Sequence, residues 1–321
     1  MRFYEIFGGI LESELEFPEL RPIRPGVADW IIRATDAPVP DGVAESIGWD
    51  AVEPNVRVHA YRLPSGYRLQ FDDTGVFDVS SDGHEISWHR SPSADERAVR
   101  LDLTGRVLAL ALHIGGCLCL HASAVSIGGR AIAFLAPKGS GKSTLAIALE
   151  RAGAEFMSDD IVPVEVTPEP VARPGAHSVR MFRDTAATLG MQMDLAMDAS
   201  TSKPMFRDSA IGRRRVNAAP LDALYLLSSI AAPDEPTVRR ERLTEPDAVM
   251  RVLGQTKIGV LLGGQEAASV LQRTADLVSV VPVYELKVAR DLSRLDDVIA
   301  SLFAWHSHEL ERAVTPVADC A

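Results

Sequence analysis

Cysteine is scarce in this sequence and offers neither a disulfide framework nor a clear metal site. The 321 residues contain three cysteines, Cys117, Cys119 and Cys320, which are too few to staple a fold. Cys117 and Cys119 lie two positions apart on one face of an apolar segment, and no second Cys or His pair follows at ligand spacing. We therefore expect these two to be small core residues.

Excess positive charge, targeting signals and long apolar runs are missing as well. The net charge of −11 argues against a non-specific nucleic-acid binder, because such proteins need basic surface to displace counterions. The N-terminus has no basic region followed by an apolar run, so we expect no signal peptide. No apolar run reaches the roughly 18 residues that a transmembrane helix requires. We expect a cytoplasmic protein whose partners include neither nucleic acid nor a membrane.

The composition is that of an ordinary globular protein, with 46% apolar and 24% charged residues. The length favours about two domains. Residues 61–90 alternate between apolar and polar positions and are punctuated by turn sequences, which predicts short antiparallel strands. We expect a β-rich N-terminal module over residues 1–100 and a second domain over residues 101–321. The second domain should open with a helix over residues 100–116.

The clearest pattern of elements runs from residue 117 to residue 158. An apolar strand over residues 117–127 is followed by a tight turn at Gly128-Gly129 and a second strand over residues 131–136. A glycine-rich loop, a helix over residues 145–151 and a strand over residues 155–158 come next. Farther along, we expect strands over residues 221–227 and 280–286 and helices over residues 245–253 and 292–303.

The loop at residues 136–143, Ala-Pro-Lys-Gly-Ser-Gly-Lys-Ser, fits the phosphate-binding pattern with alanine in place of the first glycine. Gly139 and Gly141 let the backbone curl so that successive N–H groups point at a phosphate. Lys142 is placed to reach the β- and γ-phosphates, and the Ser143 hydroxyl to ligate Mg²⁺. The residues expected to hold the nucleotide are Gly139, Ser140, Gly141, Lys142, Ser143 and Thr144.

Two adjacent carboxylates, Asp159 and Asp160, follow the strand after the loop, which brings them back beside it. Neighbouring residues of an extended segment point to opposite sides. One carboxylate can therefore face a metal ion held by Ser143 while the other accepts a hydroxyl proton beyond the γ-phosphate, as phosphoryl transfer requires. From the residues alone, His121 is as compatible with a core histidine as with a site residue.

These motifs together resemble the catalytic core of the HPr serine kinase/phosphorylase family. The matching runs are Leu-His-Ala-Ser-Ala-Val at residues 120–125, Gly-Gly-Arg at 128–130, the loop, Gly153, and Ser-Asp-Asp at 158–160. The resemblance implies an α/β fold with the P-loop core that this family shares with ATP-dependent phosphoenolpyruvate carboxykinases. It also implies ATP and Mg²⁺ as cofactors, Asp159 as general base, Asp160 as a metal-associated carboxylate, and His121 beside them.

The resemblance is good over residues 116–164 and looser over residues 174–183, 203–204 and 281–286. The N-terminal part does not resemble the N-terminal domain of the HPr-directed enzymes, and the downstream glycine-rich signature of the family is missing. The layout looks more like the HPr-kinase-like enzymes encoded with lasso-peptide biosynthesis. This likeness implies a serine kinase whose substrate is a peptide or protein, namely a lasso-peptide precursor.

Several further residues are candidates for the site on weaker sequence evidence. Arg180 and Lys203 could neutralise charge on a transferring phosphoryl group, and Arg180 is taken as a cofactor-binding candidate. The basic run Arg213-Arg214-Arg215 is expected in a solvated loop. His306 and His308 are expected to be exposed, and Gly263-Gly264 is expected to form a turn.

Two other functions remain open from the sequence: a small-molecule hydroxyl kinase on the same core, and a switch that binds ATP without phosphoryl transfer. A third possibility, an ABC-type ATPase, is disfavoured because the strand after the motif-like residues 261–266 ends in Tyr-Glu rather than Asp-Glu. The sequence also leaves open whether the chain forms a homo-oligomer.

Overall fold

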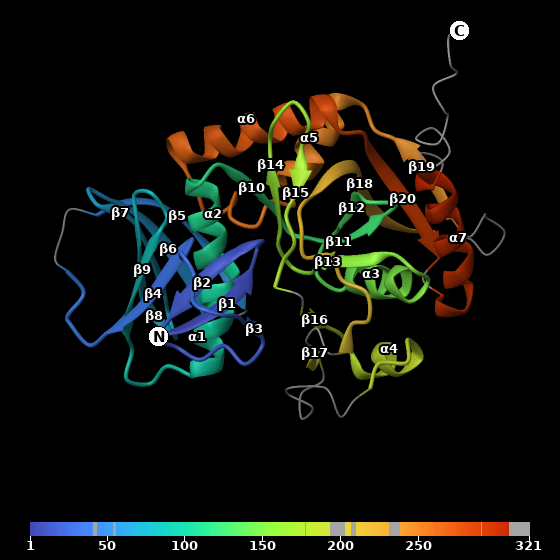
Figure 1. Ribbon diagram of the computed structural model, residues 1–321. Helices are drawn as coiled ribbons and strands as arrows, with labels where there is room; N and C mark the ends of the chain where they lie inside the picture. The colour runs from blue at the N-terminus through green and yellow to red at the C-terminus, as the bar shows by residue number, and fades with distance from the viewer. Residues whose placement is uncertain are drawn as a thin grey trace, which may run out of the picture.

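A computed structural model of the chain describes residues 1–40, 44–53, 56–176, 178–192, 203–206, 210–230, 238–289 and 291–307. Within these residues the chain is a mixed α/β protein with two nine-stranded sheets and one two-stranded ribbon (Figure 1). His308, one of the two histidines expected to be exposed, and Cys320 lie outside the described residues.

The first sheet is built from the residues before position 91, in the order β3-β1-β2-β4-β9-β8-β7-β6-β5. Its neighbours are antiparallel except for the parallel pairs β2–β4 and β4–β9. Its strands are β1 Arg2–Ile6, β2 Gly9–Ser13, β3 Arg21–Pro22, β4 Trp30–Thr35, β5 Glu45–Glu53, β6 Val56–Leu63, β7 Gly66–Phe71, β8 Gly75–Ser80 and β9 Glu85–Arg90. Alternate residues such as Phe77 and Val79 are buried, so one face of the sheet is apolar. The short antiparallel strands expected over residues 61–90 are thus confirmed.

A broken helix packs against this apolar face. It consists of α1 (Glu96–Asp102), a π-helical segment (Leu103–Val107) and α2 (Leu108–Ile114). Asp95 caps its start by accepting a hydrogen bond from the Ala98 N–H at 2.9 Å. Gly105 interrupts the helix with non-helical dihedral angles (φ −91°, ψ −109°). The expected helix over residues 100–116 is confirmed, with an earlier start and a break that the pattern did not predict.

The second sheet has the order β10-β14-β15-β18-β12-β11-β13, with β20 beside β18 and β19 beside β20. Its strands are β10 Cys117–Leu120, β11 Ala122–Ile127, β12 Arg130–Leu135, β13 Glu155–Ser158, β14 Val162–Glu165, β15 Val171–Ala172, β18 Ala219–Ile230, β19 Val238–Arg242 and β20 Val283–Ala289. The ribbon pairs β16 (Val179–Arg180) with β17 (Met205–Phe206). The helices of this half are α3 Lys142–Arg151, α4 Arg183–Thr188, α5 Glu245–Leu253, α6 Gly264–Val280, the 3-10 turn η4 Leu292–Arg294 and α7 Leu295–His306.

The strand expected over residues 117–127 is in fact two strands, divided at His121. β10 pairs with β14, whereas β11 pairs with β12 and β13. The break is held by the segment after α5: the His121 N–H donates to the Gln255 carbonyl at 2.7 Å, and the Lys257 N–H to the Cys119 carbonyl at 2.8 Å. Cys117 and Cys119 are buried, which confirms that they are core residues.

The hairpin and the helix around the glycine-rich loop agree with the sequence. Gly128 and Gly129 have φ values of 59° and 84°, as a two-residue turn between antiparallel strands requires. β12 then runs parallel to the central strand β18, and the chain leaves its carboxyl end into the loop and α3. The loop therefore lies at the edge of the sheet where parallel α/β sheets bind ligands.

The C-terminal elements depart from expectation in two places. Gly263 and Gly264 do not form a simple turn: Gly263 caps α6 and Gly264 is its first residue, so a helix of 17 residues was missed. The expected strand over residues 280–286 begins only at Val283, because Val280 is the last residue of α6. The expected helix over residues 292–303 is confirmed as η4 and α7.

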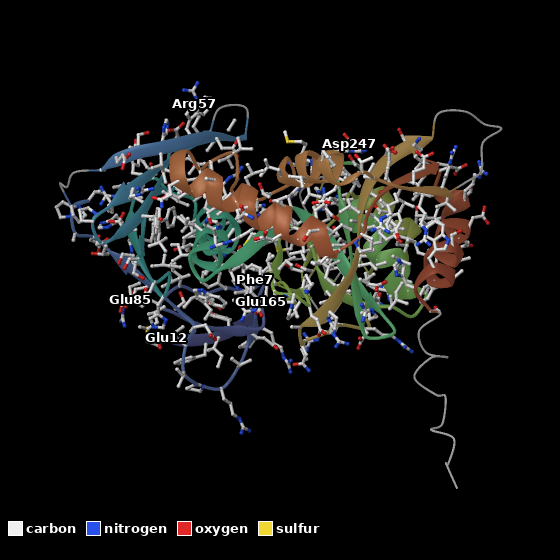
Figure 2. All side chains as sticks on the ribbon, turned by 90° about the horizontal axis from the view of Figure 1, so that it is seen from above. Phe7, Glu12, Arg57, Glu85, Glu165 and Asp247 are labelled. Carbon is white, nitrogen blue, oxygen red and sulfur yellow. The ribbon has the colours of Figure 1, made fainter. Side chains whose placement is uncertain are left out.

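One hydrophobic cluster runs through both halves, a second is confined to the second half, and α6 lies across the top of both halves in Figure 1. Glu266 of α6 accepts hydrogen bonds from Arg62 of β6 and, at 3.1 Å, from the Tyr67 hydroxyl of β7. Figure 2, seen from above, labels Phe7 of the first half and Glu165 of β14 in the second. The division into domains at residue 100 stays a prediction. None of the described helices is both long enough and apolar enough to cross a membrane.

Candidate functional site

The glycine-rich loop lines a cavity of about 920 Å³ that continues towards the first sheet and the break in the helix at Gly105. Gly139 and Gly141 have φ values of 86° and 93°, the left-handed region that favours glycine. Gly141 caps α3, which begins at Lys142. Of the loop residues expected to hold a nucleotide, Ser140 does not line the cavity; those that do are Gly139, Gly141, Lys142, Ser143 and Thr144.

The Lys142 side chain is buried and folded back over the start of its own loop. Its ammonium group donates to the Ala136 carbonyl at 2.6 Å, to the Pro137 carbonyl at 3.3 Å and to Nε2 of His121 at 3.2 Å. Burial lowers the pKa of Lys142, while the nearby carboxylates of Asp159 and Asp160 act in the opposite direction. The cation is thus held at the loop by groups that a phosphate can replace.

Asp159 is the carboxylate that contacts the loop. Its Oδ1 accepts hydrogen bonds from the Ser143 hydroxyl at 2.8 Å and from the Ser123 hydroxyl of β11. Burial raises the pKa of Asp159, and the two serine hydroxyls partly counter that rise. The sequence had led us to expect Ser143 beside Asp160; in the structure Ser143 lies beside Asp159.

Asp160 faces the cavity from a strained backbone position. Its φ of 70° lies in the left-handed region, which few non-glycine residues occupy and which aspartate tolerates better than most. Oδ2 lies 2.6 Å from the Lys257 ammonium and Oδ1 lies 3.1 Å from Nδ1 of His121, yet 54% of the side chain is exposed. Desolvation opposes the ionisation of Asp160, but Lys257 and His121 outweigh it and hold the pKa of Asp160 well below its usual range.

The neighbours of His121 determine its tautomer. A lysine ammonium can only donate, so the Nε2 atom that meets Lys142 must be the acceptor. Nδ1 then carries the proton and donates to Asp160. A continuous polar chain therefore runs from Lys142 through His121 and Asp160 to Lys257, and His121 belongs to this cluster rather than to the apolar core.

Lys257 is the site residue that the sequence analysis missed. It comes from the segment between α5 and α6, and its side chain is 12% exposed. It stands 97 positions after Asp160 in the sequence, in a stretch without a recognisable motif. The one signal that could have found it is the pairing of this segment with the break at His121, which only the fold reveals.

Three further cations gather at the loop end of the cavity: Lys138, Arg180 and Lys203. None of the three forms an ion pair with any residue that the structure describes, and Nε of Arg180 is buried without a hydrogen-bond partner there. Burial lowers the pKa of Lys203, Asp159 opposes that shift, and Arg180 and Lys138 reinforce it. Cations that lie together without ion pairs to the described residues suit a polyanionic ligand.

The remaining candidates lie elsewhere. Arg213, Arg214 and Arg215 do not line the cavity, and Arg215 forms an ion pair with Glu155 at 3.1 Å. His306 was expected to be exposed, but its side chain is only 5% exposed. No group of three or more His, Cys, Asp or Glu that could hold a metal ion occurs among the described residues.

Comparison with known proteins adds little. No protein-family model and no curated protein matches the chain. Among solved structures, the chain is similar to the HPr(Ser) kinase/phosphatase from Coxiella burnetii, with 13% sequence identity and a TM-score of 0.31. The alignment covers 60% of this chain and 98% of that one.

Proposed function

We propose that the chain is an ATP- and Mg²⁺-dependent kinase that transfers the γ-phosphoryl group to a serine hydroxyl of a peptide or protein. The observation that carries the proposal is the contact of Ser143, at the start of α3, with Asp159, beside a second carboxylate that opens into the same cavity. A loop hydroxyl, a loop lysine and a pair of aspartates are the groups that phosphoryl transfer uses.

The phosphate-binding part of the proposal rests on the loop and its cations. The left-handed glycines let backbone N–H groups turn towards an anion, and α3 adds the positive end of its dipole. In our proposal Lys142 exchanges its loop carbonyls for the β- and γ-phosphates, and Arg180 and Lys203 lie against the phosphate chain. Because Arg180 and Lys203 form no ion pair with the described residues, both are available to bind phosphate.

The residues present fit Mg²⁺. This ion needs near-octahedral oxygen ligands and is usually held by one or two carboxylates together with substrate phosphates and water. Ser143 Oγ and Asp159 Oδ1, 2.8 Å apart, are two such oxygens at the loop. Bound there, the ion would neutralise charge on the phosphates. We therefore assign Ser143 and Asp159 to the metal, which exchanges the roles that the sequence suggested for the two aspartates.

Asp160 is then the residue that accepts the hydroxyl proton. Both carboxylates line the cavity, but that of Asp160 is the more exposed, whereas Asp159 is partly buried and already accepts from two serine hydroxyls. Lys257 and His121 keep Asp160 ionised and fix its position, and each carboxylate oxygen retains a second lone pair for the hydroxyl proton. The proton leaves the serine oxygen as that oxygen bonds to phosphorus, and the former β–γ bridging oxygen leaves with the ADP.

The acceptor is proposed to be a serine of a lasso-peptide precursor. Two observations support a peptide: the motif resemblance, and the first sheet, whose strands β5 and β6 contribute Asp50, Val52 and Val56 to the cavity. A sheet that borders the site offers a surface along which an extended peptide can lie.

An assay with γ-labelled ATP and Mg²⁺ tests the proposal, with a serine-ended precursor peptide and HPr offered side by side. We expect label on the peptide, and we expect Asp160→Asn and Asp159→Asn both to lose transfer while Asp160→Asn still binds Mg²⁺–ATP. Binding of ATP without label on either protein would contradict the peptide kinase and favour a small-molecule acceptor or a switch. Failure to bind ATP would contradict the whole proposal, including the role of the glycine-rich loop.

A further inference from the structure

The ribbon of β16 and β17 presents a mixed cationic and apolar surface to the cavity. Arg180 and Phe182 are alternate residues of an extended segment, and Met181 between them is only 2% exposed. The side chains on either side of a buried residue in an extended segment point the other way. All three residues border the cavity, and Arg180 and Phe182 are the two that are not buried. Opposite them, β17 and the residues before it contribute Met205 and Lys203.

Phe182 stands out because its ring is left open inside this cavity. The side chain is 53% exposed, and Lys203 Nζ lies 5.6 Å from its ring centroid. The rings of most other phenylalanines of the described chain, including Phe134, Phe156 and Phe206 in the same half, are fully buried. An open aromatic ring beside unpaired cations suits a ligand that carries both a flat ring system and a chain of phosphates.

We infer that this ribbon holds the base of the nucleotide and that Phe182 is the platform on which the base stacks. The inference rests on the proposed function, because it takes the phosphates to lie at the glycine-rich loop. The volume of about 920 Å³ is near the upper end of the roughly 300–1,000 Å³ of small-ligand sites, so the cavity has room for a base as well as phosphates. Lys203 lies between the proposed base site and the glycine-rich loop. Its ammonium group lies over the Phe182 ring and interacts electrostatically with Asp159 and Lys138.

Calorimetric titration with Mg²⁺–ATP and with inorganic tripolyphosphate tests the inference on the full chain. Base–aromatic stacking predicts that Phe182→Ala weakens ATP binding by between about 5-fold and 100-fold. Tripolyphosphate binding should not change, because that ligand has no base. Phe182→Tyr should keep the affinity for ATP. The matched control is Trp49→Ala, which removes an aromatic ring of similar exposure, 56%, that does not line the cavity.

The titrations distinguish failure of the base-stacking inference from failure of the proposed function. Equal weakening of both ligands by Phe182→Ala, or no weakening of either, would overturn the inference. A wild-type protein that binds tripolyphosphate as tightly as ATP would also overturn it, yet would leave the phosphate-binding loop standing. A wild-type protein that binds neither ligand would contradict the proposed function itself.

Discussion

Lys257 and Asp160 form an ion pair of 2.6 Å at the cavity although 97 positions separate them in the sequence. The pair is positioned by the backbone, because the segment that carries Lys257 is hydrogen-bonded to Cys119 and His121 at the end of β10. Asp160 is thereby kept ionised while part of its carboxylate stays open to a substrate. This arrangement connects the break at His121 with the chemistry that we propose.

Removal of the Lys257 charge should change the pH dependence of phosphoryl transfer. The cation lowers the pKa of Asp160, so Lys257→Met should raise that pKa. The base form of Asp160 is populated above its pKa, and the acid limb of the kcat profile should therefore move to higher pH. We expect Lys257→Arg to restore most of the wild-type profile. A fall in kcat with an unmoved acid limb would show that Lys257 does not act through Asp160.

Two serines donate to the same carboxylate oxygen, and substituting each in turn tests whether Ser143 and Asp159 hold Mg²⁺. Ser143→Ala and Ser123→Ala each remove one hydrogen bond to Oδ1 of Asp159. Only Ser143 belongs to the loop, so only Ser143→Ala should raise the Mg²⁺ concentration required for half-maximal activity, by about tenfold or more. A Mg²⁺ titration of both variants measures this. Equal effects would mean that the hydroxyls serve only to hold Asp159.

The parts of the site that lie close together in the sequence could be predicted from it. Residues 130–160 form one strand–loop–helix–strand unit, and local pattern was enough to bring Ser143 near the two aspartates. Which aspartate meets Ser143 was not predictable, because it depends on the left-handed backbone of Asp160. Alternation along an extended strand says that the two carboxylates diverge, but not which one faces the loop.

The parts that depend on distant pairing could not be predicted. Strands β10 and β11 form one apolar run in sequence. In the fold β10 pairs with β14 and with the segment at residues 255–257, whereas β11 pairs with β12 and β13. α6 was missed because its cap, Gly263, and its first residue, Gly264, are both glycines, which usually mark turns. His306 was placed at the surface because no local pattern shows that its ring meets Asp222 and Tyr225 of β18.

The loop glycines provide a test that separates strain from ligand binding. Gly141 in the loop and Gly129 in the hairpin turn have similar φ values, 93° and 84°, and a Cβ on either would meet no atom within 4 Å. Alanine at each position should therefore cost about the same, roughly 1–2 kcal/mol of stability. Only Gly141→Ala should also weaken ATP binding, by about tenfold, because it turns loop N–H groups away from the phosphates. Thermal unfolding and calorimetry measure the two effects, and loss of ATP affinity in Gly129→Ala would show that strain alone is responsible.

The last helix is held to the sheet by a polar contact that should make stability depend on acid pH. Asp222 of β18 accepts from Nε of Arg130 at 2.8 Å, and its other oxygen lies 2.6 Å from Nδ1 of His306 in α7. The His306 and Arg130 hydrogen bonds lower the pKa of Asp222 to about 2 against the opposing effect of burial. Because the folded-state pKa is depressed, the stabilisation is present above the unfolded pKa of about 3.9 and is lost as the pH falls towards 2.

Asp222→Asn should accordingly lower the free energy of unfolding at pH 7 by about 1–2 kcal/mol, after allowance for the partial exposure of Asp222. The difference from wild type should shrink as the pH falls below about 4, because the wild-type carboxylate is then protonated in the unfolded chain and progressively in the folded one. The control is Asp36→Asn, which removes an ion pair with Arg90. The Asp36 side chain is 85% exposed, so this substitution should leave the free energy of unfolding nearly unchanged. Urea titrations at several pH values measure the effect. A deficit in Asp222→Asn that stays constant down to pH 2 would mean that the asparagine disturbs the packing of α7 rather than removing a charge.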